Sequence, residues 1–273
     1  CPVSLLASAG LSSIALRVPN HPLALESGLS AARQLLLKAS ETAALALAHR
    51  VVAVSPTTAR ILAADYGVPP ERIGVAEPGT DPAMRARGSG GQTLKILAVG
   101  SLVPRKGYDV LIEALLPLKT LSWHLDIAGA VDRSPDTLRR IEAMIASHGL
   151  ADRVTLLGPV SESALAGLYD RADLFVLASH YEGYGMVLAE ALARGLPIVC
   201  TTGGAAAETV PDGAALKVEP GSPRALAWTL GRAIDDKKIR QGIADNAWAA
   251  AQRLPRWEDT ARRIATTIEE VAR

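Results

Sequence analysis

The stretch that decides the fold is Ser179-His180-Tyr181-Glu182-Gly183-Tyr184-Gly185-Met186-Val187-Leu188-Ala189-Glu190. The apolar run 172–178 comes before it, and its composition predicts a buried strand. A helix is predicted over 186–193, and a second buried strand over 196–201. The stretch is therefore the turn of a strand–turn–helix–strand unit.

This turn has the chemistry of an anion site. Gly183 and Gly185 let the backbone approach a ligand closely. The helix that begins after them presents unpaired N–H groups and the positive end of its dipole, and diphosphate is a common occupant of such a site. Glu182 lies in the turn and Glu190 lies about one turn into the helix that follows, so both carboxylates can flank one crevice. Carboxylates accept hydrogen bonds from the paired hydroxyls of sugars.

The same alternation of strand and helix continues on both sides of the turn. Strands are predicted at 94–100, 123–129, 153–157 and 214–218, and helices at 108–116, 134–147, 161–171, 205–210, 223–235, 237–253 and 257–272. Upstream, the patterns predict strands at 11–18, 50–55 and 72–75 and helices at 29–49 and 55–65. An α/β fold follows, with a parallel sheet covered on both faces.

Composition excludes several classes of protein. The 273 residues are 49% hydrophobic and 21% charged with a net charge of +1, so nothing favours nucleic acid as a partner. No run is long and apolar enough to span a bilayer, whereas peripheral membrane contact stays open. The cysteines, Cys1 and Cys200, form no disulfide framework or metal-binding spacing, so a cytoplasmic location is expected.

Two domains are predicted. The polar, glycine-rich segment 86–93 is interpreted as a linker between a partial N-terminal domain, 1–85, and a C-terminal domain, 94–240. Residues 241–273 are expected to form helices that cross back to the N-terminal domain. The chain begins at Cys1 in what looks like the middle of an element, so we expect an N-terminal truncation.

The unusual residues of the C-terminal domain fall where strands end. In an open parallel sheet, ligands bind outside the carboxyl ends of the strands. The segments at those ends are Gly100–Gly107, Ala128–Ala130, Gly158–Pro159, the Glu182 turn, and Thr202–Glu208. One edge of the sheet therefore carries two adjacent cations, a glycine-rich helix start and two or three carboxylates. That combination suits a ligand with a negative diphosphate and hydroxyl-rich ends.

The set of motifs resembles the retaining GT-B glycosyltransferases of the group 1 type, also called family 4. The resemblance is carried by Val99-Gly100 with Lys106-Gly107, by Glu182-Gly183-Tyr184-Gly185 with Glu190, by Gly195–Val199, and by Gly203-Gly204 with Glu208. Over about residues 92–240 the chain looks like that family's Rossmann-like, nucleotide-sugar-binding domain. Residues 1–78 resemble the end of its acceptor-side domain.

The resemblance implies a transfer of sugar from a nucleoside-diphosphate sugar, with retention, to a sugar, lipid or small-molecule acceptor. Catalytic roles are implied for Glu182, Lys106, Arg105 and His21. Donor binding is implied for Gly100, Ser101, Arg105, Lys106, Gly129, Glu182, Gly183, Tyr184, Gly185, Met186, Val187 and Glu190. In such enzymes an arginine usually follows the first strand's glycine, but here Ser101 stands there, which puts the role of Arg105 in doubt. No Asp-x-Asp motif is present, so neither a metal nor another cofactor is expected.

Other interpretations stay open at this point. A chain with half of its acceptor domain missing can bind a nucleotide sugar and turn nothing over. A related nucleotide-sugar epimerase of the same fold would release free sugar without an acceptor. A phosphorylase would need a pyridoxal-bearing lysine, for which the sequence offers no context. Glu208 equally suits a brace on its own short helix.

Overall fold

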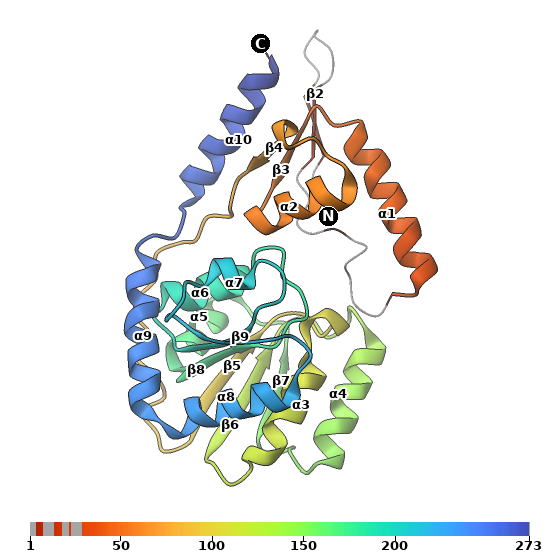
Figure 1. Ribbon diagram of the computed structural model, residues 1–273. Coiled ribbons are helices and arrows are strands. Elements are labelled where there is room, and N and C mark those ends of the chain that lie inside the picture. Colours follow the sequence, from red (N-terminus) through yellow and green to blue (C-terminus); the bar gives the residue numbers. More distant parts are fainter. Residues whose placement is uncertain (1–3, 8–13, 18–21, 23–28, 273) are drawn as a thin grey trace. The chain divides into compact units, whose positions relative to one another are not determined.

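The structure, a computed structural model, describes residues 4–7, 14–17, 22 and 29–272 (Figure 1). It divides the chain into two compact units. Unit 1 comprises Cys1–Asp81, Glu182–Gly185 and Pro255–Arg273, and unit 2 comprises Pro82–Tyr181 and Met186–Leu254. These limits differ from the predicted boundaries after residues 85 and 240. Helix α9 (Lys237–Ala251) belongs to unit 2, and the residues from Pro255 onward belong to unit 1.

Unit 2 is built on a parallel sheet of six strands in the order β10-β9-β8-β5-β6-β7. The strands are β5 (Leu94–Val99), β6 (Trp123–Ala128), β7 (Val154–Gly158), β8 (Leu174–Leu177), β9 (Ile198–Thr201) and β10 (Leu216–Val218). The helices that connect or follow them are α3 (Tyr108–Leu115), α4 (Pro135–Ser147), α5 (Glu162–Arg171), α6 (Met186–Ala193), α7 (Ala206–Thr209), α8 (Pro223–Asp235) and α9. The predicted α/β fold is confirmed, since each predicted strand and helix from residue 94 onward is present.

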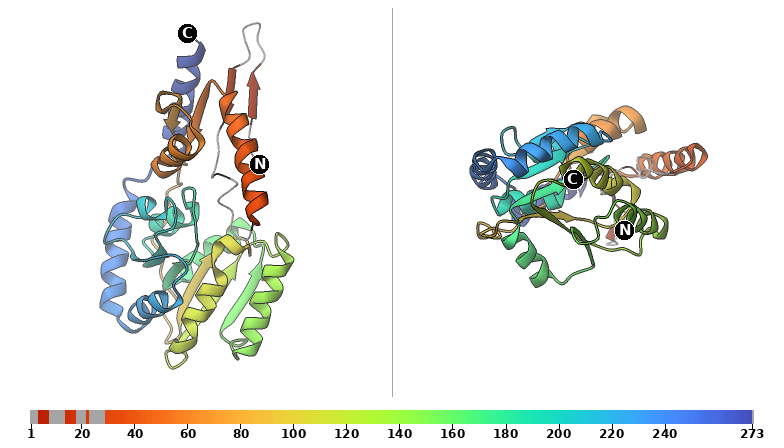
Figure 2. Two further views of the ribbon diagram at one scale, coloured as in Figure 1. Left: turned by 45° about the vertical axis from the view of Figure 1, so that its right-hand side comes forward. Right: turned by 90° about the horizontal axis from the view of Figure 1, so that it is seen from below.

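Helices cover both faces of this sheet because successive strand residues point to opposite sides. On one face, Ile96 of β5 and Val176 of β8 pack with residues of α3, α4 and α8. On the other face, Leu97 and Phe175 pack with residues of α5, α6 and α9. Figure 2 shows these helices around the strands from two further directions. The continuous apolar runs of the sequence are therefore strands buried on both sides.

Unit 1 contains a smaller sheet in the order β1-β2-β3-β4. Its strands are β1 (Ser4–Ala7), β2 (Ile14–Arg17), β3 (Arg50–Ala53) and β4 (Ile73–Val75), and its helices are α1 (Ala31–Ala46), α2 (Pro56–Tyr66) and α10 (Trp257–Ala272). β1 runs antiparallel to β2, whereas the other pairs are parallel. The strand β1 was not predicted. Leu45 of α1 and Leu62 of α2 pack with Val51, while Ile264 of α10 packs with Val52, whose side chain points the other way.

Two hydrogen bonds join the segment after β4 to the segment before α10 in unit 1. The Thr80 N–H donates to the Pro255 carbonyl over 2.8 Å, and the Arg256 guanidinium donates to the Thr80 carbonyl over 2.8 Å. The last helix, α10, is thereby fixed to the segment that leaves β4. None of the described helices is long and apolar enough to cross a membrane.

One glycine allows two loops to come into contact at the carboxyl edge of the unit 2 sheet. Gly107 lies between the 3-10 turn Pro104–Lys106 and α3, with φ of +63°. A Cβ at this position would lie 2.3 Å from the carbonyl oxygen of Ala178, which follows β8. The loop after β5 and the loop after β8 therefore meet backbone to backbone, which a larger residue would prevent.

We predict that Gly107→Ala lowers the free energy of unfolding by about 3 kcal/mol or more, because it combines backbone strain with a steric clash. Gly149→Ala is the matched control, since Gly149 has φ of +61° and open space around its Cβ position. The control should lose only the strain, about 1–2 kcal/mol. Denaturant unfolding of the two variants measures the difference, and equal losses would contradict the contact.

Candidate functional site

The predicted site residues divide between the two units. Glu182, Gly183, Tyr184 and Gly185 belong to unit 1, whereas the other predicted donor-binding residues belong to unit 2. His21 lies outside the residues that the structure describes.

In unit 2 the strand order changes direction between β5 and β8. From β5 the chain proceeds outward through β6 to β7 on one side, and from β8 through β9 to β10 on the other. Loops that leave neighbouring strands in opposite directions open a crevice at the carboxyl edge, which is the usual ligand site of such sheets. The segments that leave this point are Gly100–Gly107 after β5 and Ala178–Tyr181 after β8. They hold several of the predicted residues.

The two segments are bonded to one another. The His180 N–H donates to the Arg105 carbonyl over 2.8 Å. The Arg105 guanidinium returns a bond of 2.6 Å from Nη1 to the Tyr181 carbonyl. With the contact of Gly107 on Ala178, these bonds hold the two segments together at the switch point.

Bare backbone lines the ends of β5 and β6. Gly129 has φ of +152°, and a Cβ on it would lie 2.1 Å from the Gly100 carbonyl oxygen. A Cβ on Gly100 would in turn lie 3.0 Å from Cε of Lys106, so the lysine stem passes over Gly100. Ser101 follows directly, and the Tyr108 hydroxyl donates to the Gly100 carbonyl over 2.8 Å. The structure thus brings together Gly100, Lys106 and Gly129 as one group.

Arg105, the sequence neighbour of Lys106, interacts with the loop after β8. The Arg105 side chain is part-buried and donates to the backbone of the β8 loop. Its charge is therefore engaged with the protein, which favours a structural role for this residue over the phosphate contact that the resemblance implies.

Glu190 lies on α6, and its carboxylate is held by a tyrosine that the sequence did not single out. The Tyr169 hydroxyl donates to Glu190 Oε2 over 2.8 Å. Tyr169 is fully buried, and burial together with the Glu190 carboxylate raises the pKa of its phenol well above its usual range. Tyr108 adds to that rise. Its position in the apolar face of α5, after Leu165 and Leu168, was the available sequence signal.

Helix α6 begins at Met186, as predicted, and its first residues Met186 and Val187 are half-buried. Glu208 lies on the short helix α7 with an exposed side chain. Cys200 is buried in β9, and burial raises the pKa of its thiol to about 12, so it is a packing residue.

In unit 1, the turn Glu182–Gly185 contacts the first turn of α2. The Thr58 hydroxyl donates to the Gly183 carbonyl over 3.2 Å. Ser55 caps α2 by accepting from the Thr58 N–H over 3.0 Å. Glu182 and Tyr184 are both buried in this arrangement, and burial, aided by Glu77, raises the pKa of Tyr184 to about 12. The carboxylate of Glu182 is thus held away from bulk water.

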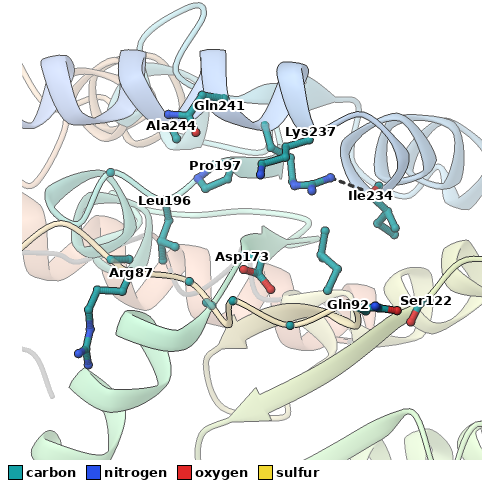
Figure 3. A pocket seen from close by; sticks show the side chains of 18 of the residues that line it. Arg87, Gln92, Ser122, Asp173, Leu196, Pro197, Ile234, Lys237, Gln241 and Ala244 are labelled. Atoms are coloured by element: carbon teal, nitrogen blue, oxygen red, sulfur yellow. Dashed lines mark hydrogen bonds between the residues drawn. The ribbon is translucent and has the colours of Figure 1, made fainter.

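A cavity of about 580 Å³ lies at the opposite, amino-terminal edge of the unit 2 sheet. Figure 3 shows Asp173 near its centre, and Lys237 and Gln241 of α9 also line it. Of the predicted site residues that the structure describes, none lines it.

The charged groups of this cavity mostly bind the protein itself. Asp173 accepts hydrogen bonds from the backbone N–H groups of Ser89 and Lys95, over 2.9 and 2.8 Å. Arg85 pairs with Asp245, and Arg240 donates to the last carbonyls of α8. These contacts anchor the segment that leads into β5. We therefore interpret this cavity as a gap between packed segments of unit 2 and not as a ligand-binding site.

No cluster of three or more histidine, cysteine or acidic side chains within the described parts of the chain is placed to hold a metal ion. The acidic side chains of the predicted site, Glu182 and Glu190, belong to different units.

Two family models match the chain. The model described as "Glycosyl transferases group 1" matches residues 81–249, and "Glycosyltransferase Family 4" matches residues 17–84. The first match covers unit 2 almost completely, and includes Lys106 and Glu190.

Curated relatives are similar over most of this chain. It is 29% identical to mannosylfructose-phosphate synthase of Agrobacterium fabrum, over 80% of this chain and 52% of that protein. It is 31% identical to D-inositol 3-phosphate glycosyltransferase of Acidothermus cellulolyticus, over 82% of this chain and 54% of that protein. The chain thus spans about half the length of these relatives.

Solved structures share the fold. Anabaena Alr3699/HepE in complex with UDP and glucose matches with a TM-score of 0.81 at 22% identity, over 93% of this chain and 71% of that chain. Sucrose-phosphate synthase from Thermosynechococcus elongatus matches with a TM-score of 0.79 at 26% identity, over 94% of this chain and 67% of that chain.

We predict that Arg105→Ala lowers the free energy of unfolding by about 1–3 kcal/mol, because it removes a charged hydrogen bond between the two loops. Arg139→Ala is the control, since Arg139 forms an exposed ion pair with Asp136 and its loss should cost less than about 1 kcal/mol. Denaturant unfolding compares the two. Equal stability of the two variants would argue against a stabilising role for the bond from Arg105 to the Tyr181 carbonyl.

Proposed function

Because the chain belongs to the glycosyl transferases group 1 family, we propose that it transfers a sugar from a nucleoside-diphosphate sugar to an acceptor, with retention at the anomeric carbon. The observation that supports this most directly is the group at the β5–β8 switch point. There Lys106 passes over the bare backbone of Gly100, and unit 2 also carries the oriented carboxylate of Glu190.

The donor is proposed to bind with its diphosphate near Lys106 and the beginning of α6. The lysine supplies a positive charge, and the helix supplies unpaired N–H groups and the positive end of its dipole. Glu190 accepts hydrogen bonds from the ribose hydroxyls. A structural neighbour, Anabaena Alr3699/HepE, was solved with UDP-glucose, which supports a nucleotide sugar as donor.

In the reaction, the bond between the anomeric carbon and the diphosphate oxygen breaks and a bond to the acceptor hydroxyl forms, with release of the acceptor's proton. Negative charge develops on the leaving diphosphate, and Lys106 stabilises it. The roles proposed for the remaining residues follow the family resemblance. Glu182 binds hydroxyls of the transferred sugar, the backbone of Gly183–Gly185 contacts the donor, and His21 is assigned a catalytic role.

The acceptor remains a sugar, lipid or small molecule. The names of the similar proteins include mannosylfructose-phosphate, D-inositol 3-phosphate and sucrose-phosphate, so phosphorylated sugars and inositol phosphate are the first acceptors to test. Release of nucleoside diphosphate that depends on such an acceptor, with an α-to-α or β-to-β outcome by NMR, would support transfer. Free sugar formed without an acceptor would instead indicate the epimerase alternative.

We predict that the chain binds one of UDP, GDP or ADP in calorimetric titration, and that Lys106→Ala and Glu190→Ala each weaken binding by roughly tenfold or more. Arg139→Ala, on the exposed face of α4, is the control and should bind as the wild type does. A folded chain that binds none of the three nucleotides would contradict the donor site. Binding without any transfer to the acceptor panel would favour the alternative of a nucleotide-sugar-binding protein without turnover.

We also predict that transfer needs no divalent metal, because the charge of the leaving diphosphate is met by Lys106 and the helix N-terminus. Activity should therefore be the same in excess EDTA as in added Mg²⁺ or Mn²⁺. Activity abolished by the chelator and restored by either cation would refute this prediction.

A further inference from the structure

The Tyr169–Glu190 pair links two helices through the core of unit 2. Tyr169 lies on α5 and Glu190 on α6, 21 residues apart in sequence, and the bond from the hydroxyl to Oε2 is 2.8 Å long. The tyrosine ring is stacked on Phe175 of β8, with ring centroids 5.8 Å apart and an interplanar angle of 23°. Arg194 covers the same ring, with its guanidinium carbon 4.5 Å from the centroid. The phenol is therefore fixed from several sides.

The hydroxyl of Tyr169 donates its hydrogen bond to the Glu190 carboxylate. A buried phenol needs a hydrogen-bond partner, and here the described partner is a carboxylate on a neighbouring helix. The raised pKa of Tyr169 keeps it protonated, and so a donor, across the physiological range. A phenylalanine would fill the same space on Phe175 and under Arg194. The hydroxyl itself is thus needed for Glu190 and not for packing.

Glu190 is held at both its backbone and its side chain. Arg194 donates from Nη1 to the Glu190 carbonyl over 3.0 Å, while the same guanidinium lies over the Tyr169 ring. Glu190 is half-buried, and its other oxygen, Oε1, has no hydrogen-bond partner among the described residues. These contacts hold the Glu190 carboxylate in one orientation and leave Oε1 available to accept a hydrogen bond. Such preorganisation lowers the entropy cost of binding a ligand.

We propose that Tyr169 is a positioning residue that orients the Glu190 carboxylate toward the paired ribose hydroxyls of a nucleoside diphosphate. This proposal rests on the function proposed above, in which Glu190 binds the ribose. Tyr169 does not touch the ligand. It acts by keeping the carboxylate in the rotamer that accepts from both hydroxyls.

The test compares the nucleoside diphosphate that binds tightest among UDP, GDP and ADP with its 2′,3′-dideoxy analogue, by calorimetry. The wild type should prefer the ribonucleotide. Tyr169→Phe should weaken binding of the ribonucleotide roughly fivefold to tenfold and leave the affinity for the dideoxy analogue unchanged. In the background of Glu190→Ala, Tyr169→Phe should have no further effect on either ligand.

The chain offers a matched control in Tyr66→Phe. Tyr66 is also buried and also donates to a glutamate, Glu41, over 3.3 Å, but this pair lies in unit 1. Tyr66→Phe should therefore leave both affinities as in the wild type. Like Tyr169→Phe, this variant removes a hydrogen bond from a buried tyrosine to a glutamate. It therefore shows whether losing such a bond anywhere in the protein changes nucleotide affinity.

The outcomes separate this proposal from the proposed function. Ribonucleotide binding that is weakened by Glu190→Ala but not by Tyr169→Phe would overturn the positioning role and leave the donor site intact. An equal loss for the ribonucleotide and the dideoxy analogue would mean that Tyr169 is only structural, which also overturns the proposal. A wild type that binds no nucleotide, or does not distinguish the two ligands, would overturn the assignment of Glu190 itself.

Discussion

The candidate site depends on the contact between two loops that leave neighbouring strands in opposite directions. After β5 the chain turns toward β6, and after β8 it turns toward β9, so the two loops diverge at the carboxyl edge. Gly107 keeps them in contact, because its lack of a side chain lets its backbone approach the Ala178 carbonyl closely. The hydrogen bonds between Arg105 and the 180–181 segment then follow at short range. Lys106 is carried on the loop that this contact holds in place.

Most of the fold is predictable from the sequence because its signals are local. The strands of unit 2 are apolar or alternating runs, and glycine directly follows β5 and β6. Helices such as α2 and α8 have a capping serine followed by proline. Two features escaped prediction. The strand β1 has the sequence Ser-Leu-Leu-Ala, which contains no β-branched or aromatic residue to indicate a strand. Helix α9 was separated from the donor domain, since its sequence shows that one face is apolar but not which unit covers that face.

The residue types of the candidate site were predictable, whereas their partners were not. A glycine-rich turn, a lysine after a strand and a glutamate on the following helix are recognisable because their chemistry suits a diphosphate and a diol. That Tyr169 holds Glu190 depends on how α5 packs beside α6, and no spacing in the sequence encodes it. The burial of Glu182 and Tyr184 depends likewise on residues of unit 1 that lie more than a hundred positions earlier, such as Thr58, whose bond to Gly183 spans 125 residues.

The adjacent cations show why sequence position alone does not assign a role. A 3-10 turn advances about three residues per turn, so Arg105 and Lys106 point in directions roughly 120° apart. The guanidinium, which is planar, permanently charged and weakly hydrated, suits a part-buried contact with the Tyr181 carbonyl. The ammonium is a compact point charge on a flexible stem and suits a ligand whose charge moves during reaction. Ser101 stands where an arginine is usual in the family, and Arg105 binds the protein's own loops. In the proposed function, the positive charge for the donor therefore comes from Lys106 and the start of α6.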